Sequence, residues 1–141
     1  MRVRLLAVVA AFLAPGFAGT ARAADATILE HKGRWESGYG STWYNVVGRV
    51  KNTSDHPLRF VKIRIDAVDE SGKVVASTET YNESAEVLTV PEANPKDLLA
   101  KGKVKPLAAA GEERFRGSFL KDETPPFKDY RVIVGETPAA P

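Results

Sequence analysis

The sequence predicts an all-β fold, an immunoglobulin-like two-sheet sandwich of about seven strands with a short helical turn in residues 94–101. Three observations lead to this class. Apolar and polar residues alternate over several short segments, turn-forming residues separate these segments, and the chain has the length of one ordinary domain. A period of two places successive side chains on opposite faces of a strand.

The first 23 residues have the three parts of a secretory signal peptide. Arg2 and Arg4 precede an apolar run from Leu5 to Leu13, and Ala21-Arg22-Ala23 supplies the small residues that signal peptidase accepts. The apolar run is shorter than the roughly 17–25 residues that a membrane-spanning helix needs. We therefore expect cleavage after Ala23, no transmembrane anchor in the mature chain, and a periplasmic or secreted product.

Removal of this leader changes the charge of the chain. The full sequence has 20 Lys and Arg against 18 Asp and Glu. Arg2, Arg4 and Arg22 leave with the leader, so 17 basic and 18 acidic side chains remain, a net charge of −1. This composition does not favour nucleic-acid binding. The absence of cysteine excludes disulfides, thiolate chemistry and a lipid-attachment cysteine.

Two strands open the mature domain, which we expect over residues 24–135. The first covers residues 26–31 and continues at 34–36, and the second covers residues 42–52. The alternation places four residues of the second strand toward the core: Tyr44, Val46, Gly48 and Val50.

A hairpin follows these two strands. Residues 58–69 form a strand, and the turn at 69–72 begins with Asp and ends with Gly, so residues 74–81 fold back. The alternation predicts an inward set, Val61, Ile63, Ile65 and Ala67, and an outward set, Lys62, Arg64 and Asp66.

The C-terminal part contains an irregular segment and two further strands. Within residues 82–106 we expect a short strand at 87–90 and then a helical turn with Asn94 as its N-cap and Gly102 as its stop. The strands at 114–120 and 130–134 direct alternate residues inward: Phe115, Gly117, Phe119, Tyr130, Val132 and Val134. We expect a disordered tail at residues 136–141.

Residues 47–54, 61–65, 69–75 and 107–115 resemble the FxLYD domain family, and the similarity covers residues 44–134. These bacterial extracytoplasmic modules have a β-sandwich fold and no assigned activity. The naming motif of the family aligns with residues 65–69, where only the Asp is kept. The resemblance implies a fold and an extracytoplasmic location, and it carries over no catalytic residue.

Catalytic and metal-binding patterns are weak in this sequence. His31 and His56 have no partners at ligand or triad spacing, and Ser54, Asp55 and His56 are too close together to form a catalytic triad. Asp66, Asp69 and Glu70 lie close together in the sequence. Calcium needs six or more oxygen ligands, and we do not expect these three residues alone to supply them. We therefore expect a protein that is not an enzyme and has no cofactor or metal.

Basic residues could gather on one face of the predicted sandwich. If the strands at 58–69, 114–120 and 130–134 form one sheet, its outer face carries five of them: Lys62, Arg64, Arg114, Arg116 and Arg131. Such a face suits an anionic envelope polymer, a lipid head group or an acidic protein. The alternative is a solvated face whose charges discourage edge pairing.

An aromatic cluster lies around the first turn. Trp35, Tyr39 and Trp43 offer a platform for stacking on sugar rings or packing into a partner, and the alternative is packing at the rim of the core. We therefore predict an exported binding or adaptor module of the bacterial cell envelope, whose partner is another envelope protein or an anionic envelope component. A carbohydrate-binding protein with this aromatic platform is the alternative, and a hydrolase ranks third.

Overall fold

The computed structural model describes residues 25–90, 92 and 94–141, so the expected signal peptide at residues 1–23 lies outside the described part of the chain. Within these described residues, three short helices accompany the strands: η2 (Glu83–Thr89), α2 (Pro95–Ala100) and η3 (Lys121–Glu123). The described strands are β1 (Ala26–Gly38), β2 (Ser41–Asn52), β3 (Lys62–Val68), β4 (Val74–Tyr81), β5 (Glu112–Leu120) and β6 (Asp129–Val134).

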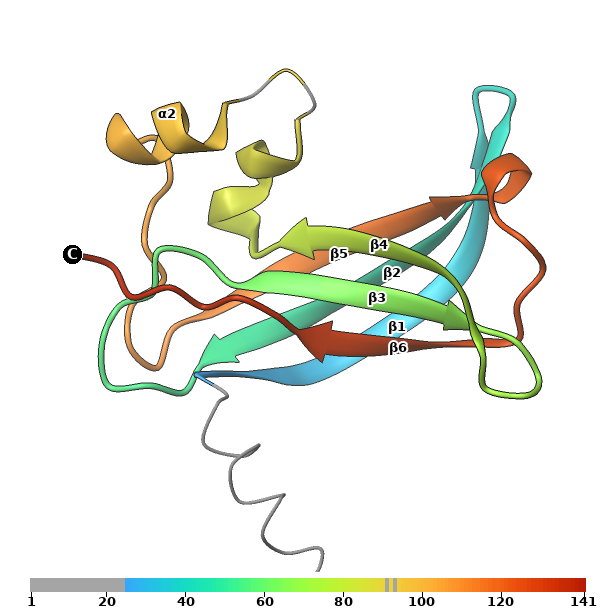
Figure 1. The fold of residues 1–141 in the computed structure, drawn as a ribbon, viewed down its shortest axis with the longest axis horizontal. Helices are drawn as coiled ribbons and strands as arrows, with labels where there is room; N and C mark the ends of the chain where they lie inside the picture. The colour runs from blue at the N-terminus through green and yellow to red at the C-terminus, as the bar shows by residue number, and fades with distance from the viewer. Residues whose placement is uncertain (1–24, 91, 93) are drawn as a thin grey trace, which may run out of the picture.

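The strands form two three-stranded antiparallel sheets, with the orders β1-β2-β5 and β4-β3-β6. Figure 1 shows the two sheets as superposed layers, with the end of the β1–β2 hairpin extending beyond the rest of the sandwich. The predicted all-β, two-sheet sandwich is therefore confirmed. Both helices of the 82–106 connection, η2 and α2, lie at one end of the layers (Figure 1).

The described residues contain six strands, one fewer than the expected seven. The segments expected at 26–31 and 34–36 are one continuous strand, β1, which pairs with β2 along its length. The strand expected at 87–90 is wrong, because η2 occupies residues 83–89 and no ladder partner reaches it. The helical turn after it is confirmed, since the Asn94 side chain accepts a hydrogen bond from the Asp97 N–H and Gly102 takes a φ of +67°.

The main core lies between the sheets and contains most of the residues that the alternation directed inward. Tyr44, Tyr130, Val132 and Val134 are only partly buried against it. The fully or nearly fully buried members are Ala26, Val46, Val50, Leu58, Val61, Ile63, Ile65, Ala67, Leu107, Phe115 and Phe119. A second cluster beneath η2 and α2 contains Phe60, Ala85, Leu88 and Val104, with Leu98 and Leu99 packed against it.

Asp66 is an exception to the alternation. It was expected to face water, but it is only 3% exposed. Its carboxylate accepts a hydrogen bond from the Ser77 hydroxyl at 2.6 Å and pairs with Arg64 at 3.1 Å. Neighbouring side chains on the outer face of β3 and β4 therefore cover this carboxylate, and the hydrogen bonds offset the cost of its burial.

The C-terminal tail also differs from expectation. Residues 136–141 were expected to be disordered, whereas the backbone of 136–140 lies along residues 57–62. The N–H groups of Arg59 and Lys62 donate to the carbonyls of Pro138 and Glu136, at 2.7 and 2.9 Å. This pairing also explains why the strand expected from residue 58 begins at Lys62, because the residues before it bond to the tail instead.

Three glycines of the first sheet face the core, and neighbouring side chains cover them. A Cβ atom on Gly33 would overlap the Tyr44 ring, and one on Gly117 would lie 2.6 Å from the Ile65 Cδ1. A Cβ on Gly48 would lie 2.6 Å from the Phe115 ring and would also collide with the carbonyl oxygen of Glu30. The sheets and strands therefore approach one another only because these positions have no side chain.

We predict that Gly48→Ala lowers the free energy of unfolding by roughly 1–3 kcal/mol, because the new methyl group must displace both an aromatic ring and a backbone carbonyl. Gly38→Ala is the control, since a Cβ there meets nothing within 4 Å, and it should change stability by less than about 0.5 kcal/mol. Urea denaturation measures both. Equal stability of the two variants would contradict the close approach at Gly48.

Candidate functional site

The outer face of β1-β2-β5 gathers charged side chains in rows across the strands. In one row Val47 of β2 lies between Lys32 of β1 and Arg116 of β5, its register partners. The row beside it places Arg49 between Glu30 and Arg114. Because directly paired residues of a ladder point to the same face, the members of each row share the outer surface.

Basic residues outnumber acidic ones on this face. It carries six basic side chains, Lys32, Arg34, Arg49, Lys51, Arg114 and Arg116, against three acidic ones, Glu30, Glu36 and Glu112, a net charge of +3. We call this surface the basic face. Since residues 24–141 together have a net charge of −1, the arrangement of the strands segregates the positive charge here.

Two of the six cations are held in ion pairs on the face. The Arg49 guanidinium donates to Glu30 at 2.7 Å and to Glu112 at 2.6 Å, and these carboxylates raise its pKa. Arg34 pairs with Glu36 at 2.8 Å, and hydrogen bonds from Asn45 and then Arg34 lower the pKa of the Glu36 carboxyl. Within the part of the chain that the structure describes, Lys32, Arg114 and Arg116 have no ion-pair partner within 4 Å.

The basic face is hollowed along the middle. One groove of about 770 Å³ lies over Val47 and Arg49 between β1, β5 and η2, and a smaller one of about 240 Å³ continues past Arg34 and Asn45. The two grooves share Lys32 and Val47, and we refer to them together as the trough. Val47 is 44% exposed, so the trough has an apolar floor between basic walls.

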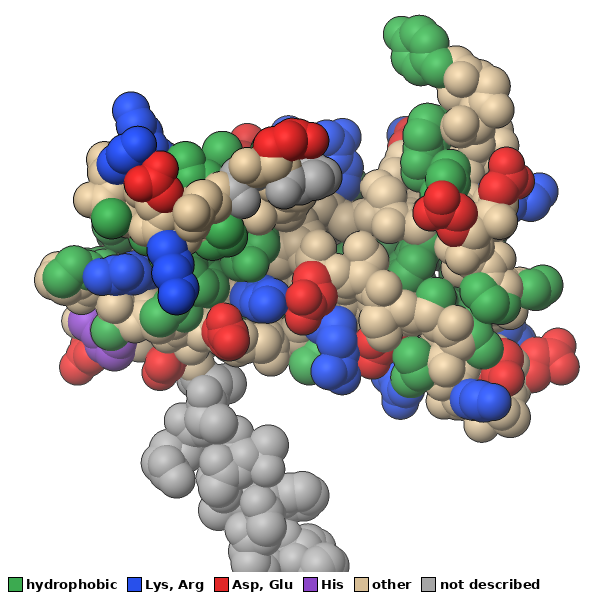
Figure 2. Space-filling view, turned by 45° about the horizontal axis from the view of Figure 1, so that its top comes forward, with side chains coloured by type: hydrophobic (Ala, Val, Ile, Leu, Met, Phe, Trp, Pro, Cys, Tyr) green, Lys and Arg blue, Asp and Glu red, His purple; other side chains and the backbone are tan. Residues whose placement is uncertain are grey.

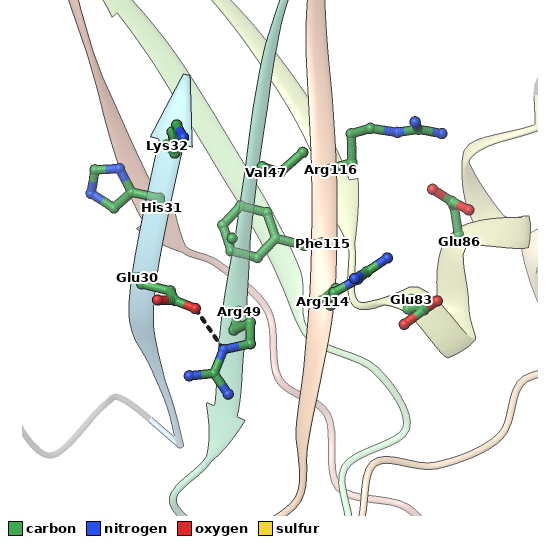
Figure 3. A pocket seen from close by; sticks show the side chains of 11 residues that line it. Glu30, His31, Lys32, Val47, Arg49, Glu83, Glu86, Arg114, Phe115 and Arg116 are labelled. Carbon is green, nitrogen blue, oxygen red and sulfur yellow. Dashed lines mark hydrogen bonds and ion pairs between the residues drawn. The ribbon is translucent and has the colours of Figure 1, made fainter. Parts of the chain in front are cut away.

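The short helix η2 forms one rim of the larger groove. Glu83 and Glu86 line it from η2, and Figure 3 shows them beside Arg114 and Arg116, across the face from Lys32. The rim therefore adds two carboxylates to an otherwise basic wall. Sequence analysis missed this juxtaposition because it expected a strand in this segment.

A buried polar network holds η2 in this position. Glu113, which points inward from β5, accepts hydrogen bonds from the Ser84 N–H at 2.8 Å, the Ser84 hydroxyl at 2.6 Å and the Asn82 amide at 2.9 Å. Asn82 is fully buried, and its side-chain oxygen accepts a hydrogen bond from the Val61 N–H at 2.7 Å. Burial favours the neutral form of Glu113, but the donors at Ser84 and Asn82 outweigh it and lower the pKa.

The five basic residues expected on one face are divided between two. β5 pairs with β2 rather than with β3 or β6, so Arg114 and Arg116 lie on one sheet while Lys62, Arg64 and Arg131 belong to the other. Lys62 pairs with Glu79 at 3.4 Å and Arg64 with Asp66 at 3.1 Å. The expected surface is therefore wrong in membership, and a basic face exists on the other sheet.

The three aromatic residues do not form one platform. Trp35 packs on Tyr44, with ring centroids 5.2 Å apart, and on Phe127 at 5.7 Å, and it remains 48% exposed. Trp43 precedes Tyr44 in the same strand and is paired with Glu36, so it belongs to the opposite face. The expected platform of Trp35, Tyr39 and Trp43 is thus divided between the two faces and the tip of the β1–β2 hairpin.

Tyr39 occupies that tip. It is fully exposed, and Figure 2 shows a hydrophobic side chain at the end of the projecting hairpin. Tyr39 and Gly40 have φ values of +50° and +79°, as in a primed two-residue turn. A tyrosine at positive φ is unfavourable, because its Cβ crowds the backbone.

The remaining polar candidates have structural roles. Ser54 donates its hydroxyl to the Asn52 side chain at 2.7 Å, while the fully buried Asn52 amide lies 2.8 Å from the His56 carbonyl. His31 contacts the Tyr130 hydroxyl at 2.8 Å. In the described residues no group of three or more His, Cys, Asp or Glu is placed to hold a metal ion.

Comparison with known proteins gives no relative: no family model, no curated protein and no solved structure matches the chain. In the ranges that the structure describes, no helix has the length and hydrophobicity to cross a membrane. The geometry of the basic face and its trough is therefore what supports a functional proposal.

The Glu113 network predicts acid sensitivity. The pKa of Glu113 is lower in the folded chain than its ordinary value of 4.5, so the unfolded chain takes up the proton first. The stabilisation is then present above pH 4.5 and is lost as the pH falls through the lowered pKa. We expect Glu113→Gln to be less stable than the wild type at pH 7, with a difference in unfolding free energy that shrinks below pH 4.5.

Urea denaturation from pH 7 to pH 3 measures this difference. Glu70→Gln is the charge-matched control, because Glu70 is exposed in the β3–β4 turn and lies outside the network. It should change stability at pH 7 by less than about 0.5 kcal/mol. A Glu113→Gln variant as stable as the wild type at pH 7 would show that the carboxylate does not support η2.

Proposed function

We propose that this chain is an exported, non-enzymatic binding module of the bacterial cell envelope that engages its partner through the basic face. The observation that carries this proposal is the trough, where the exposed Val47 lies between Lys32 and Arg116. An extracytoplasmic location follows from the leader at residues 1–23 and agrees with the resemblance to the FxLYD family.

A solvated sheet face is the simpler alternative, but it does not account for all features of this surface. Basic residues that discourage pairing belong on edge strands, and Lys32, Arg114 and Arg116 do lie on the edge strands β1 and β5. This alternative does not explain the exposed Val47 on the central strand β2. Three cations without ion-pair partners around an apolar floor fit the recognition of a ligand with negative charge. The separation of Trp35 from Trp43 removes the platform on which the carbohydrate-binding alternative depended.

Export predicts a defined mature N-terminus. When the precursor is expressed with its leader in a bacterial host, N-terminal sequencing of the extracytoplasmic product should begin at Ala24, because Ala21 and Ala23 fit the peptidase. Ala21→Leu with Ala23→Leu should block cleavage and leave the precursor at the membrane. A cytoplasmic product that keeps its leader would contradict export.

Use of the basic face predicts a position-dependent cross-link. A photo-crosslinking amino acid at Val47 should form an adduct in isolated envelopes, because this side chain lies on the floor of the trough. The same amino acid at Val74, which is similarly exposed on the other sheet, is the positional control. We expect the yield at Val47 to exceed that at Val74 and to fall in 0.5 M salt, since salt screens exposed charges.

Arg114→Ala with Arg116→Ala tests the chemistry of the same adduct. Both side chains are exposed, so their removal leaves the core intact, and the Val47 adduct should disappear if these cations hold the partner. Equal yields at Val47 and Val74, or an adduct that survives loss of both arginines, would overturn the proposal.

A further inference from the structure

We infer that the trough holds an extended segment of a partner protein, with acidic side chains on either side of an apolar one. This inference rests on the proposed function, because it names the class of partner for the same face. The shape of the trough, the spacing of its cations and the carboxylates on its rim carry it.

The shape comes first. The two grooves join through Lys32 and Val47 and follow the central strand β2, so the trough is elongated rather than round. Its larger part lies between β1 and the rim formed by η2. An elongated depression bounded on one side by η2 accepts a single extended chain more readily than a flat surface.

The spacing of the cations fits a polypeptide in extended conformation. Lys32 and Arg34 lie two residues apart on β1, and Arg114 and Arg116 lie two residues apart on β5. Side chains on one face of a strand recur every two residues, roughly 7 Å. The side chains on the lower face of an extended segment recur at the same interval. With one side chain over Val47, the next ones on either side lie over the row that contains Arg34 and the row that contains Arg114.

The exposed Val47 at the centre of the trough floor favours a partner with an apolar side chain at that point. Val47 is surrounded by Lys32 and Arg116 in its own row, and Asn45 and Arg49 flank it along β2. A chain that lies over β2 must place one side chain on this exposed valine. A protein segment can offer Val, Leu or Ile at that point, which a uniformly charged polymer cannot.

The rim carboxylates oppose a uniform polyanion. Glu83 and Glu86 lie beside Arg114 and Arg116, and Glu30 lies on the opposite side of the groove. Like charges repel, so a phosphate polymer or an acidic polysaccharide would meet repulsion from Glu83 and Glu86 at the rim. A protein segment avoids it, because its acidic residues occur only at chosen positions.

The experiment uses the mature chain, residues 24–141, and a labelled nonapeptide with the sequence Glu-Thr-Glu-Thr-Val-Thr-Glu-Thr-Glu. In extended form its odd positions present four glutamates around one central valine on a single face. Fluorescence anisotropy at low salt should show saturable binding. Replacement of the central valine by serine should weaken binding several-fold, and 0.5 M salt should abolish it.

Two pairs of substitutions assign the site. Arg114→Ala with Arg116→Ala should weaken binding of the peptide at least tenfold, because charge-assisted hydrogen bonds to carboxylates are among the stronger polar contacts. Lys128→Ala with Arg131→Ala removes two exposed cations outside the basic face and should leave affinity within about twofold. Circular dichroism confirms that both variants are folded. Peptide binding that survives loss of both arginines would overturn the inference.

Two further probes separate the inference from the proposed function. Long-chain polyphosphate and phosphatidylglycerol vesicles carry the negative charge without the peptide backbone or the valine. If either binds through Arg114 and Arg116 while the peptide does not, the trough is an anion site and the protein segment is wrong. If none of the three probes binds through these arginines, both the inference and the proposed face are wrong.

Discussion

A polar bridge between the sheets, centred on the fully buried Asn82, determines the shape of the end of the molecule that carries η2. Asn82, at the end of β4, joins the backbone of Val61 before β3 to the carboxylate of Glu113 in β5. The bridge thus links both sheets at the point where the chain turns into η2. Buried amide and carboxylate groups must find partners, since leaving one unsatisfied costs about 1–3 kcal/mol. The position of η2, and with it the rim of the trough, follows from this requirement.

The inner glycines are the second constraint on the first sheet. Gly33, Gly48 and Gly117 point toward the core, where Tyr44, Phe115 and Ile65 occupy the space that their side chains would fill. Tyr44, Phe115 and Ile65 therefore fill the space over the glycines, where a Cβ atom would otherwise lie. The same strands carry their charged residues on the other side, so one sheet is built from small and aromatic residues inside and from cations outside.

Alternation in the sequence was enough to predict the fold class and most of the core. Val46, Ile63, Ile65 and Phe115 are buried as expected, because a period of two directly reports which face of a strand is covered. Alternation does not report which strands become neighbours. β5 pairs with β2, about 60 residues before it, and this long-range choice decided which basic residues share a face.

Local irregularities account for the other differences. The register of β1 against β2 shifts between Ile28 and Glu30, which changes the face on which the following residues lie, and it placed Lys32 and Arg34 on the outer surface. A segment with Val87 and Val90 resembles a strand by composition, but both residues are exposed in and beside η2. Neither the bulge in β1 nor the helical turn of η2 follows from the strand propensity of the residues in it.

The basic face is a local concentration of positive charge in a nearly neutral chain. Six cations and three carboxylates occupy the outer surface of one sheet, so the local charge is positive although residues 24–141 together have a net charge of −1. A local field of this kind orients an approaching ligand, because the acidic residues elsewhere repel it while the face attracts it. The trough is open to solvent along its length, and exposed charge pairs contribute little each. For the proposed partner, several such contacts acting together around one apolar contact at Val47 would favour reversible and salt-sensitive binding over permanent assembly.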